Sequence, residues 1–277
     1  MHSLMLLGTS SSVGKSTVSN ILCRHFTNLG RKVLPFKALN LASKSTTLPD
    51  GSEIGTGQAI QAIACRTIPD ARMNPIFLKP EKNRTVCYIR GRETGSYPSR
   101  RYPEQNKRLQ KYALDAYWEL ASEAELVILE GSGSCCELNI LSSDIANLAM
   151  AKAANSPCIL VADIENGGVF GTIYGTLFLL PPEDRARFKG IIINKFHGSP
   201  SLFKDGVQQI ERLTKLPVLG VLPFLSKKLP EEDGVQAKNL SFAALSLPAI
   251  HARLDFLAQE AEKHLDFTQI GKIAGFH

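Results

Sequence analysis

The sequence has no apolar run that approaches the roughly 20 residues of a membrane span, and no cleavable signal pattern at its start. Its six cysteines, at positions 23, 65, 87, 135, 136 and 158, lack the CxxC spacing of zinc and redox sites. Nothing in it resembles a Ser-His-Asp hydrolase, an internal repeat or a low-complexity block. We therefore expect a cytoplasmic protein with reduced thiols and no membrane partner.

The composition is that of a folded α/β protein. The chain has 277 residues, of which 44% are hydrophobic and 21% are charged. This is enough for one large domain or two small ones, and it is not the composition of a disordered chain. The net charge of +6 is spread along the sequence. Such a charge would suit a small anionic substrate as well as nucleic acid, so it does not choose between them.

The most informative stretch is a glycine-bounded loop near the N-terminus. It follows the apolar run at 4–7 and opens a segment, 17–29, with helical apolar spacing. A strand, such a loop and a helix are the context of a phosphate-binding loop, because backbone N–H groups and the helix dipole attract the anion. Lys15 would reach the β- and γ-phosphates of a nucleotide, and the Ser16 hydroxyl would hold Mg²⁺. Five residues, not the usual four, separate Gly8 from Gly14; a chance Gly/Ser-rich turn is the alternative.

Apolar strands alternate with helical segments through most of the chain. Continuous apolar strands of this kind are typical of a parallel sheet that is covered on both faces. The pattern predicts a doubly wound, mainly parallel α/β sheet, with 1–225 as one domain. Residues 226–277 are expected to form a C-terminal tail that contains one helix and packs on this domain. The expected strands are 4–7, 32–36, 126–130, 158–163, 190–195 and 218–223, and the expected helices are 17–29, 58–66, 104–123, 145–154, 167–180, 201–215 and 249–264.

Other stretches are predicted to be irregular. Residues 40–57 form a polar loop with a turn signal at 49–51, and residues 90–104, rich in Arg, Gly, Pro and Tyr, resemble an exposed excursion. Within the polar loop, Asp50 and Glu53 are ordinary solvated carboxylates unless one of them contacts Mg²⁺.

Four polar residues fall at the ends of predicted strands, namely Lys37, Glu130, Asp163 and Asn194. Because ligands bind beyond the carboxyl ends of parallel strands, we expect these residues on the same rim as the phosphate-binding loop. Glu130 is a candidate for a second Mg²⁺ ligand or a water-orienting group. Asn194 could read a nucleotide base or cap a turn. Lys37 could neutralise developing charge or be an ordinary solvated lysine.

Taken together, the motifs resemble the ATP-dependent amidoligases of the dethiobiotin synthetase fold, and most closely the N-terminal synthetase domain of the cobyric acid synthase family. The resemblance runs in order from residue 4 to about residue 225, and this family uses the same five-residue gap in its loop. It is carried by Gly8-Thr-Ser-Ser-Ser-Val-Gly-Lys-Ser16, Pro35-Phe-Lys-Ala38, Asp50-Gly-Ser-Glu-Ile-Gly55, Met73-Asn-Pro75, Leu78-Lys-Pro80, Glu130-Gly-Ser-Gly-Ser134, Glu137-Leu-Asn139, Asp144-Ile-Ala-Asn147, Asp163-Ile164, Gly167-Gly-Val-Phe170, Ile193-Asn-Lys-Phe196 and Gly220-Val-Leu-Pro223.

The resemblance implies that ATP phosphorylates a carboxylate of a corrin precursor and that ammonia then displaces the phosphate to give an amide. ATP and Mg²⁺ are the implied cofactors, a small polycarboxylate is the implied substrate, a homodimer is expected, and nucleic acid is not a partner. The implied catalytic residues are Lys15 and Lys37, and the implied metal ligands are Ser16, Glu130 and Asp50. Nucleotide contacts would come from Thr9, Ser10, Ser11, Ser12, Val13, Gly14, Lys15, Ser16, Thr17, Asn194 and Pro223, and substrate contacts from Asn40, Lys44, Ser132, Gly133, Gly167 and Gly168.

The chain also departs from the family pattern. No cysteine with a histidine partner follows Pro223, so ammonia is expected from solution or from a separate glutaminase subunit. Residues near the implied substrate pocket are altered, with Leu39, Lys44 and Ser143 in place of Gln, Asn and Arg. The alternatives are therefore a dethiobiotin synthetase-like ring closure of a diamine substrate, a partner-switching P-loop ATPase, and a nucleotide-binding subunit without catalysis.

Overall fold

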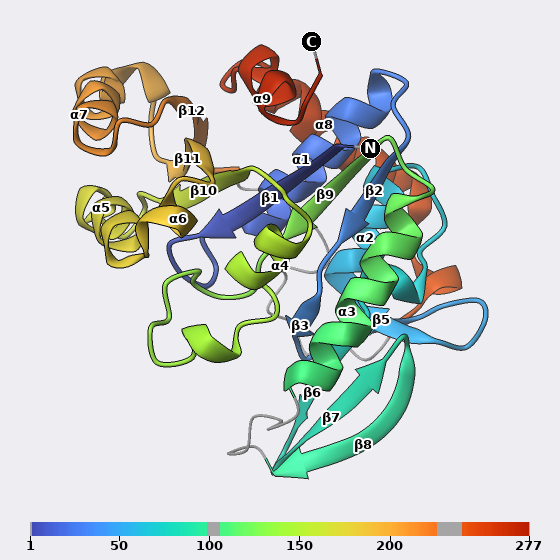
Figure 1. Ribbon diagram of the computed structural model, residues 1–277. Coiled ribbons are helices and arrows are strands. Elements are labelled where there is room, and N and C mark those ends of the chain that lie inside the picture. Colours follow the sequence, from blue (N-terminus) through green and yellow to red (C-terminus); the bar gives the residue numbers. More distant parts are fainter. Residues whose placement is uncertain (1, 99–105, 226–239, 277) are drawn as a thin grey trace.

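The central sheet consists of six parallel strands in the order β12-β11-β10-β1-β9-β2. The fold is known from a computed structural model that describes residues 2–98, 106–225 and 240–276 (Figure 1). Most residues of these strands are buried, because helices cover both faces. The predicted doubly wound parallel sheet is confirmed. The strands are β1 (His2–Gly8), β2 (Val33–Phe36), β9 (Leu126–Glu130), β10 (Cys158–Asp163), β11 (Phe188–Phe196) and β12 (Val218–Pro223).

Each face of the sheet has its own hydrophobic core, and β1 contributes to both. Leu4 and Leu6 belong to the core under α1, α2, α8 and α9, whereas Met5 and Leu7 belong to the core under α3, α4, α5 and α7. This division follows from the strand geometry, in which successive side chains point to opposite faces. The helices are α1 (Lys15–Asn28), α2 (Thr56–Ala64), α3 (Asn106–Ala121), α4 (Leu148–Ala153), α5 (Val169–Leu179), α6 (Pro182–Arg185), α7 (Lys204–Thr214), α8 (Leu247–Glu262) and α9 (Phe267–Ile273), with 3₁₀ turns at Ala71–Met73, Leu141–Ser143, Pro200–Phe203 and Phe242–Ala244.

Two smaller sheets lie beyond the end of β2, and the sequence did not predict them. One has the order β3-β6-β7-β8, with β3 (Leu39–Leu41), β6 (Ile76–Glu81), β7 (Arg84–Ile89) and β8 (Arg92–Pro98). The other joins β4 (Ser45–Thr47), β5 (Glu53–Gly55) and β13 (Leu240–Ser241). The prediction of an irregular loop at 40–57 was therefore wrong for the strands, although the turn predicted at 49–51 is present between β4 and β5. Residues 92–98 form β8 and not an irregular excursion, although residues 92–94 and 96 are exposed as predicted; residues 99–104 lie outside the described residues. In the small sheets, β3–β6 and β4–β13 join segments that are distant in sequence, and such pairing has no local signal.

The described part of the tail packs on the face of the central sheet that α1 and α2 cover. Helix α8 contacts α1 and α2, and the buried Arg24 of α1 lies 2.7 Å from Nδ1 of His251. Two helices are present where one was predicted. Helix α9 is only seven residues long, which is too short for a clear periodic pattern, and its start is capped by the Asp266 side chain. Residues 226–239 are outside the described part, and the division at residue 225 stays a prediction. None of the helices in the described ranges has the length and apolarity to cross a membrane.

Candidate functional site

A cavity of about 890 Å³ opens at the carboxyl ends of the central strands. The loop after β1, the ends of β2, β9 and β11, and the start of α2 all contribute to it, as expected for a doubly wound sheet. It also reaches the β3–β4 segment and the segment after β12. Its lining comprises Ser11, Ser12, Gly14, Lys15, Ser16, Thr17, Lys37, residues 40–44, Thr56, Gly57, Gln58, Pro80, Glu130, Ser132, Gly133, Glu165, Asn194, Lys195, Phe224, Leu225 and Leu257.

The loop that precedes α1 is bounded by two glycines in close surroundings, and the backbone requires glycine at the second one. Gly14 has a φ of +94°, and a Cβ atom there would lie 2.0 Å from Nδ2 of Asn194. A Cβ atom at Gly8 would lie 2.8 Å from the Lys15 ammonium nitrogen. The N-cap residue of α1 is Gly14, which has no side chain that could cap the helix, and the first turn of α1 has no acidic residue. A helix start of this kind favours an anion near its first N–H groups.

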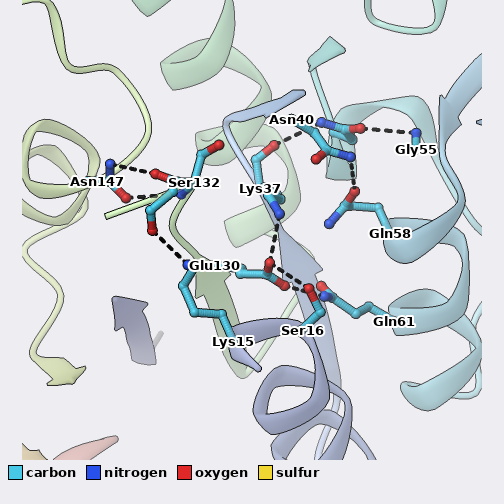
Figure 2. A network of polar contacts seen from close by, with 12 residues as sticks. Lys15, Ser16, Lys37, Asn40, Gly55, Gln58, Gln61, Glu130, Ser132 and Asn147 are labelled. Carbon is cyan, nitrogen blue, oxygen red and sulfur yellow. Dashed lines mark hydrogen bonds and ion pairs between the residues drawn. The ribbon is translucent and has the colours of Figure 1, made fainter. Parts of the chain in front are cut away.

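The Glu130 carboxylate is the centre of a polar network (Figure 2). Its Oε1 accepts hydrogen bonds from the Ser16 hydroxyl at 2.9 Å and from the Lys37 ammonium at 2.7 Å. Its Oε2 accepts a hydrogen bond from Nε2 of Gln61. Three segments of the chain, α1, the end of β2 and α2, thus meet at the one carboxylate that ends β9 (Figure 2).

Charge and burial decide the ionisation of this network. Burial alone would raise the pKa of Glu130, but the charge and hydrogen bond of Lys37, the charge of Lys15 and the Ser16 hydroxyl outweigh it. The pKa of Glu130 is therefore below its ordinary value, and the group is a carboxylate at neutral pH. Burial has the opposite effect on the Lys15 ammonium and, although Glu130 opposes it, lowers the pKa of Lys15 to about 8. The site thus combines two lysines with one buried carboxylate.

The Lys15 ammonium is held by backbone carbonyl groups from two loops. It donates to the carbonyl oxygen of Ser10 at 3.0 Å and to that of Gly133 at 2.6 Å. The loop of Ser132 and Gly133 is fixed in turn by Asn147, whose side chain accepts from the Ser132 N–H and donates to the Ser132 carbonyl (Figure 2). Asp144 accepts hydrogen bonds from the backbone N–H of Asn147 and two further residues. The motif 144–147 therefore positions the loop that contacts Lys15.

Three buried amide side chains complete the network, and sequence reasoning missed their roles. Asn74 donates to the carbonyl of Lys37 and accepts from the N–H of Gly55, which ties the end of β2 to the start of α2. Gln58 accepts from the Asn40 side chain and faces the cavity, and Gln61 donates to Glu130. The available signal was the pair of glutamines in the otherwise apolar stretch 58–64, since buried polar groups require partners.

The structure brings most of the predicted site residues together, but not all of them. Asn194 lies against the loop, where its Nδ2 donates to the carbonyl of Val13 at 2.8 Å. Asp50 lies at the exposed tip of the β4–β5 hairpin. Its Oδ1 accepts hydrogen bonds from the backbone N–H and the hydroxyl of Ser52, and it does not line the cavity. Gly167 and Gly168 form the left-handed turn before α5 and are not in the lining, to which Glu165 contributes instead. Pro223 ends β12 just before the lining residues at 224 and 225.

Comparison with known proteins identifies relatives of almost the whole chain. Residues 4–234 match the family of CobQ/CobB/MinD/ParA nucleotide binding domains. The chain is 44% identical over 272 residues to a cobyric acid synthase of Clostridium perfringens, an alignment that covers 98% of this chain and 55% of the relative. It is 45% identical over 270 residues to that of Klebsiella pneumoniae, covering 94% and 53%, and 42% identical over 281 residues to a probable cobyric acid synthase of Methanocella arvoryzae, covering 98% and 58%.

The chain thus spans about half the length of these relatives. Among solved structures, the MinD cell division protein of Aquifex aeolicus superimposes with a TM-score of 0.50 at 12% identity, over 99% of this chain and 95% of that one. At this identity the match concerns the fold alone.

Proposed function

The chain belongs to the family of CobQ/CobB/MinD/ParA nucleotide binding domains, and we propose that it is the synthetase part of an ATP- and Mg²⁺-dependent amide ligase of cobalamin biosynthesis. Its substrate is a corrin precursor with free side-chain carboxylates, as in cobyric acid synthase. The observation that carries this proposal is the meeting of Ser16, Lys37 and Glu130 beside the phosphate-binding loop, in a chain that is 44% identical to a cobyric acid synthase.

In the proposed reaction, a carboxylate oxygen of the substrate attacks the γ-phosphorus of ATP. The bond between this phosphorus and the β–γ bridging oxygen breaks, ADP leaves, and an acyl phosphate forms. The nitrogen of ammonia then attacks the acyl carbon, the bond to the phosphate oxygen breaks, and hydrogen phosphate leaves with the proton that the nitrogen loses. Lys15, Lys37 and the N–H groups at the start of α1 stabilise the negative charge of the transferring phosphoryl group, which is the main requirement of such a transfer.

The residues present fit a magnesium ion. Glu130 is ionised and Ser16 offers a hydroxyl oxygen, and oxygen atoms of this kind are the ligands that Mg²⁺ prefers. Ser16 and Glu130 would hold the ion, which supplies positive charge next to the phosphates when it is bound. Asp50, at the tip of its hairpin, is left out of this proposal. Lys37 then balances the Glu130 charge and faces the cavity in which the substrate carboxylate would lie.

The proposal is tested with purified protein, ATP and MgCl₂. One arm contains cobyrinic a,c-diamide with ammonium chloride, and a second contains diaminopelargonic acid with bicarbonate. We expect ADP release and an amide product, detected by mass spectrometry, in the first arm alone. ADP release in the second arm alone would assign a dethiobiotin synthetase-like activity. Absence of ADP with either substrate would refute the ligase proposal.

The source of nitrogen is tested in the same assay. We propose that ammonia enters either free or from a separate glutaminase, because five of the six cysteines are buried and none of the six lines the described cavity, so none is placed as an accessible nucleophile there. Glutamine in place of ammonium chloride should then give no product with this chain alone. Product formation from glutamine without a second protein would contradict this part of the proposal.

A further inference from the structure

Gln61 has a buried side-chain amide in which the nitrogen is hydrogen-bonded and the oxygen is not. It lies in α2 and is fully buried, although its neighbours in the helix are apolar. Its Nε2 donates to Oε2 of Glu130, whereas its Oε1 has no hydrogen-bond partner among the described residues. Native proteins leave few buried acceptors unpaired, and each exception calls for an explanation.

Reversing the amide does not remove the unpaired acceptor. The Lys37 ammonium forms an ion pair with Oε1 of Glu130 at 2.7 Å, and a carboxylate in such a pair can only accept hydrogen bonds. The amide nitrogen of Gln61 must therefore face Glu130, and the amide oxygen must face elsewhere. The side chains of Gln61, Ser16 and Glu130 converge at one point (Figure 2). The missing donor is thus expected next to the two oxygen ligands of the proposed metal site.

A hydrated magnesium ion would supply such a donor. Mg²⁺ usually keeps several of its water molecules in protein sites, and these waters donate hydrogen bonds to surrounding acceptors. Neither nearby lysine supplies this donor in the structure, since Lys37 donates to Glu130, Lys15 donates to two carbonyl groups, and Oε1 of Gln61 has no partner among the described residues. A carboxylate ligand that is hydrogen-bonded by a second residue is also a recurrent feature of metal sites.

We propose that Gln61 is a positioning residue for the Mg²⁺ site: its Nε2 fixes the Glu130 carboxylate, and its Oε1 accepts a hydrogen bond from the hydration shell of the ion. This inference rests on the proposed function, because it requires the ion. It adds a residue of α2 to a site whose ligands come from α1 and β9. It also gives a reason for a fully buried glutamine whose amide oxygen has no partner among the described residues.

The test measures Mg²⁺ binding directly by titration calorimetry, with the protein saturated by a non-hydrolysable ATP analogue. Gln61→Met keeps the volume of the side chain but removes both hydrogen-bonding groups. We expect its dissociation constant for Mg²⁺ to rise about 10- to 100-fold, the usual effect of removing a residue that supports a metal ligand. Affinity for the analogue in EDTA should stay within about threefold of the wild type, since among the described residues the Gln61 side chain hydrogen-bonds to Glu130 and not to the phosphate-binding loop.

The matched control is Gln58→Met in the same helix. Gln58 is also buried, but its side chain pairs with Asn40 and not with Glu130. Because Gln58 faces the cavity, this control is compared without substrate, and in that titration the Mg²⁺ affinity of Gln58→Met should equal that of the wild type. Gln61→Asn serves as a second variant if Gln61→Met does not fold, because it keeps an amide that is too short to reach both partners.

Four results would overturn the inference. An unchanged Mg²⁺ affinity of folded Gln61→Met would mean that the glutamine does not act on the metal. An equal loss in Gln61→Met and Gln58→Met, or a matching loss of analogue binding in EDTA, would assign Gln61 a merely structural role. Wild-type protein that binds no Mg²⁺ with the analogue would refute the metal site itself, and with it the proposed function.

Discussion

The Lys37 ammonium lies 2.7 Å from Oε1 of Glu130, and both side chains are buried. Lys37 follows β2 and Glu130 is the last residue of the adjacent parallel strand β9; because Phe36 pairs with Leu129, the next residue along each chain stands at the same level of the sheet. The register of β2 and β9 therefore creates the ion pair. A buried pair of this kind is weak evidence for stability, but it holds a charged group in one place at the cavity.

Removal of the Lys37 charge should impair catalysis more than nucleotide binding. In Lys37→Met we expect the rate of ADP formation to fall about 100- to 1000-fold, because a positioned cation would no longer stabilise the transferring phosphoryl group. The affinity for ATP, measured by calorimetry, should change much less. Lys37→Arg keeps the charge and should retain more activity than Lys37→Met. A Lys37→Met variant with a wild-type rate would remove Lys37 from the reaction.

Nucleotide affinity should depend on the ionisation of Lys15. The pKa of Lys15 in the free protein is about 8, and a bound phosphate would raise it. ATP affinity should therefore be constant below pH 8 and fall by up to about tenfold per pH unit above it. Calorimetric titrations on both sides of pH 8 measure this slope. Lys15→Met should bind ATP weakly at every pH and lack the slope; a Lys15→Met variant with wild-type affinity would place the nucleotide elsewhere.

The pKa of Lys15 also affects stability. Whereas ATP affinity should fall as pH rises, the free energy of unfolding should rise. Its pKa is about 8 in the folded protein, against the ordinary value of 10.5 for a solvated lysine. The unfolded chain therefore binds more protons than the folded one between these values, and this group makes the free energy of unfolding rise with pH in that range. Urea unfolding of the wild type and of Lys15→Met at matched pH values isolates the contribution of Lys15. The free energy of unfolding of the wild type minus that of Lys15→Met should rise with pH in this range. If it fell, the lowered pKa of Lys15 would be contradicted.

Metal dependence should distinguish Glu130 from Asp50. In Glu130→Gln we expect the Mg²⁺ concentration for half-maximal ADP release to rise by about tenfold or more, because the ionised ligand is lost. Asp50 is exposed at a hairpin tip and caps Ser52. In Asp50→Asn the Mg²⁺ dependence should match that of the wild type. Equal shifts in the two variants would mean that the hairpin reaches the site when substrates bind.

Asn74 should matter for stability, since it joins segments that flank the site. Its buried side chain bonds to Lys37, Gly55 and Ile76, and Asn74→Ala would leave these backbone groups unpaired. We expect the free energy of unfolding, measured in urea, to fall by about 2–4 kcal/mol. Asn83→Ala, in the exposed turn between β6 and β7, is the control and should change it by less than about 0.5 kcal/mol. Similar values for the two variants would contradict this role.

Much of the site could be predicted because its parts are local. The glycine-bounded loop can be recognised from the strand before it and the helix after it. The buried strands that carry Glu130 and Asn194 can be recognised from their continuous apolar residues. Parallel strands place such ends on one rim, so the rim position of Lys37 also followed. Asp50 could not be judged in this way, because its position depends on the hairpin that β4 and β5 form with each other.

The sequence by itself determined the central sheet, the phosphate-binding loop and the rim on which the candidate catalytic groups lie, since these depend on periodicity and on residues that are close along the chain. Only the tertiary structure decided the small sheets, the displacement of Asp50 from the cavity and the roles of Asn74 and Gln61. The physical reason is that a buried amide is defined by its partners. The partner of Gln61 is Glu130, 69 positions further along the chain, and folding alone brings the two together.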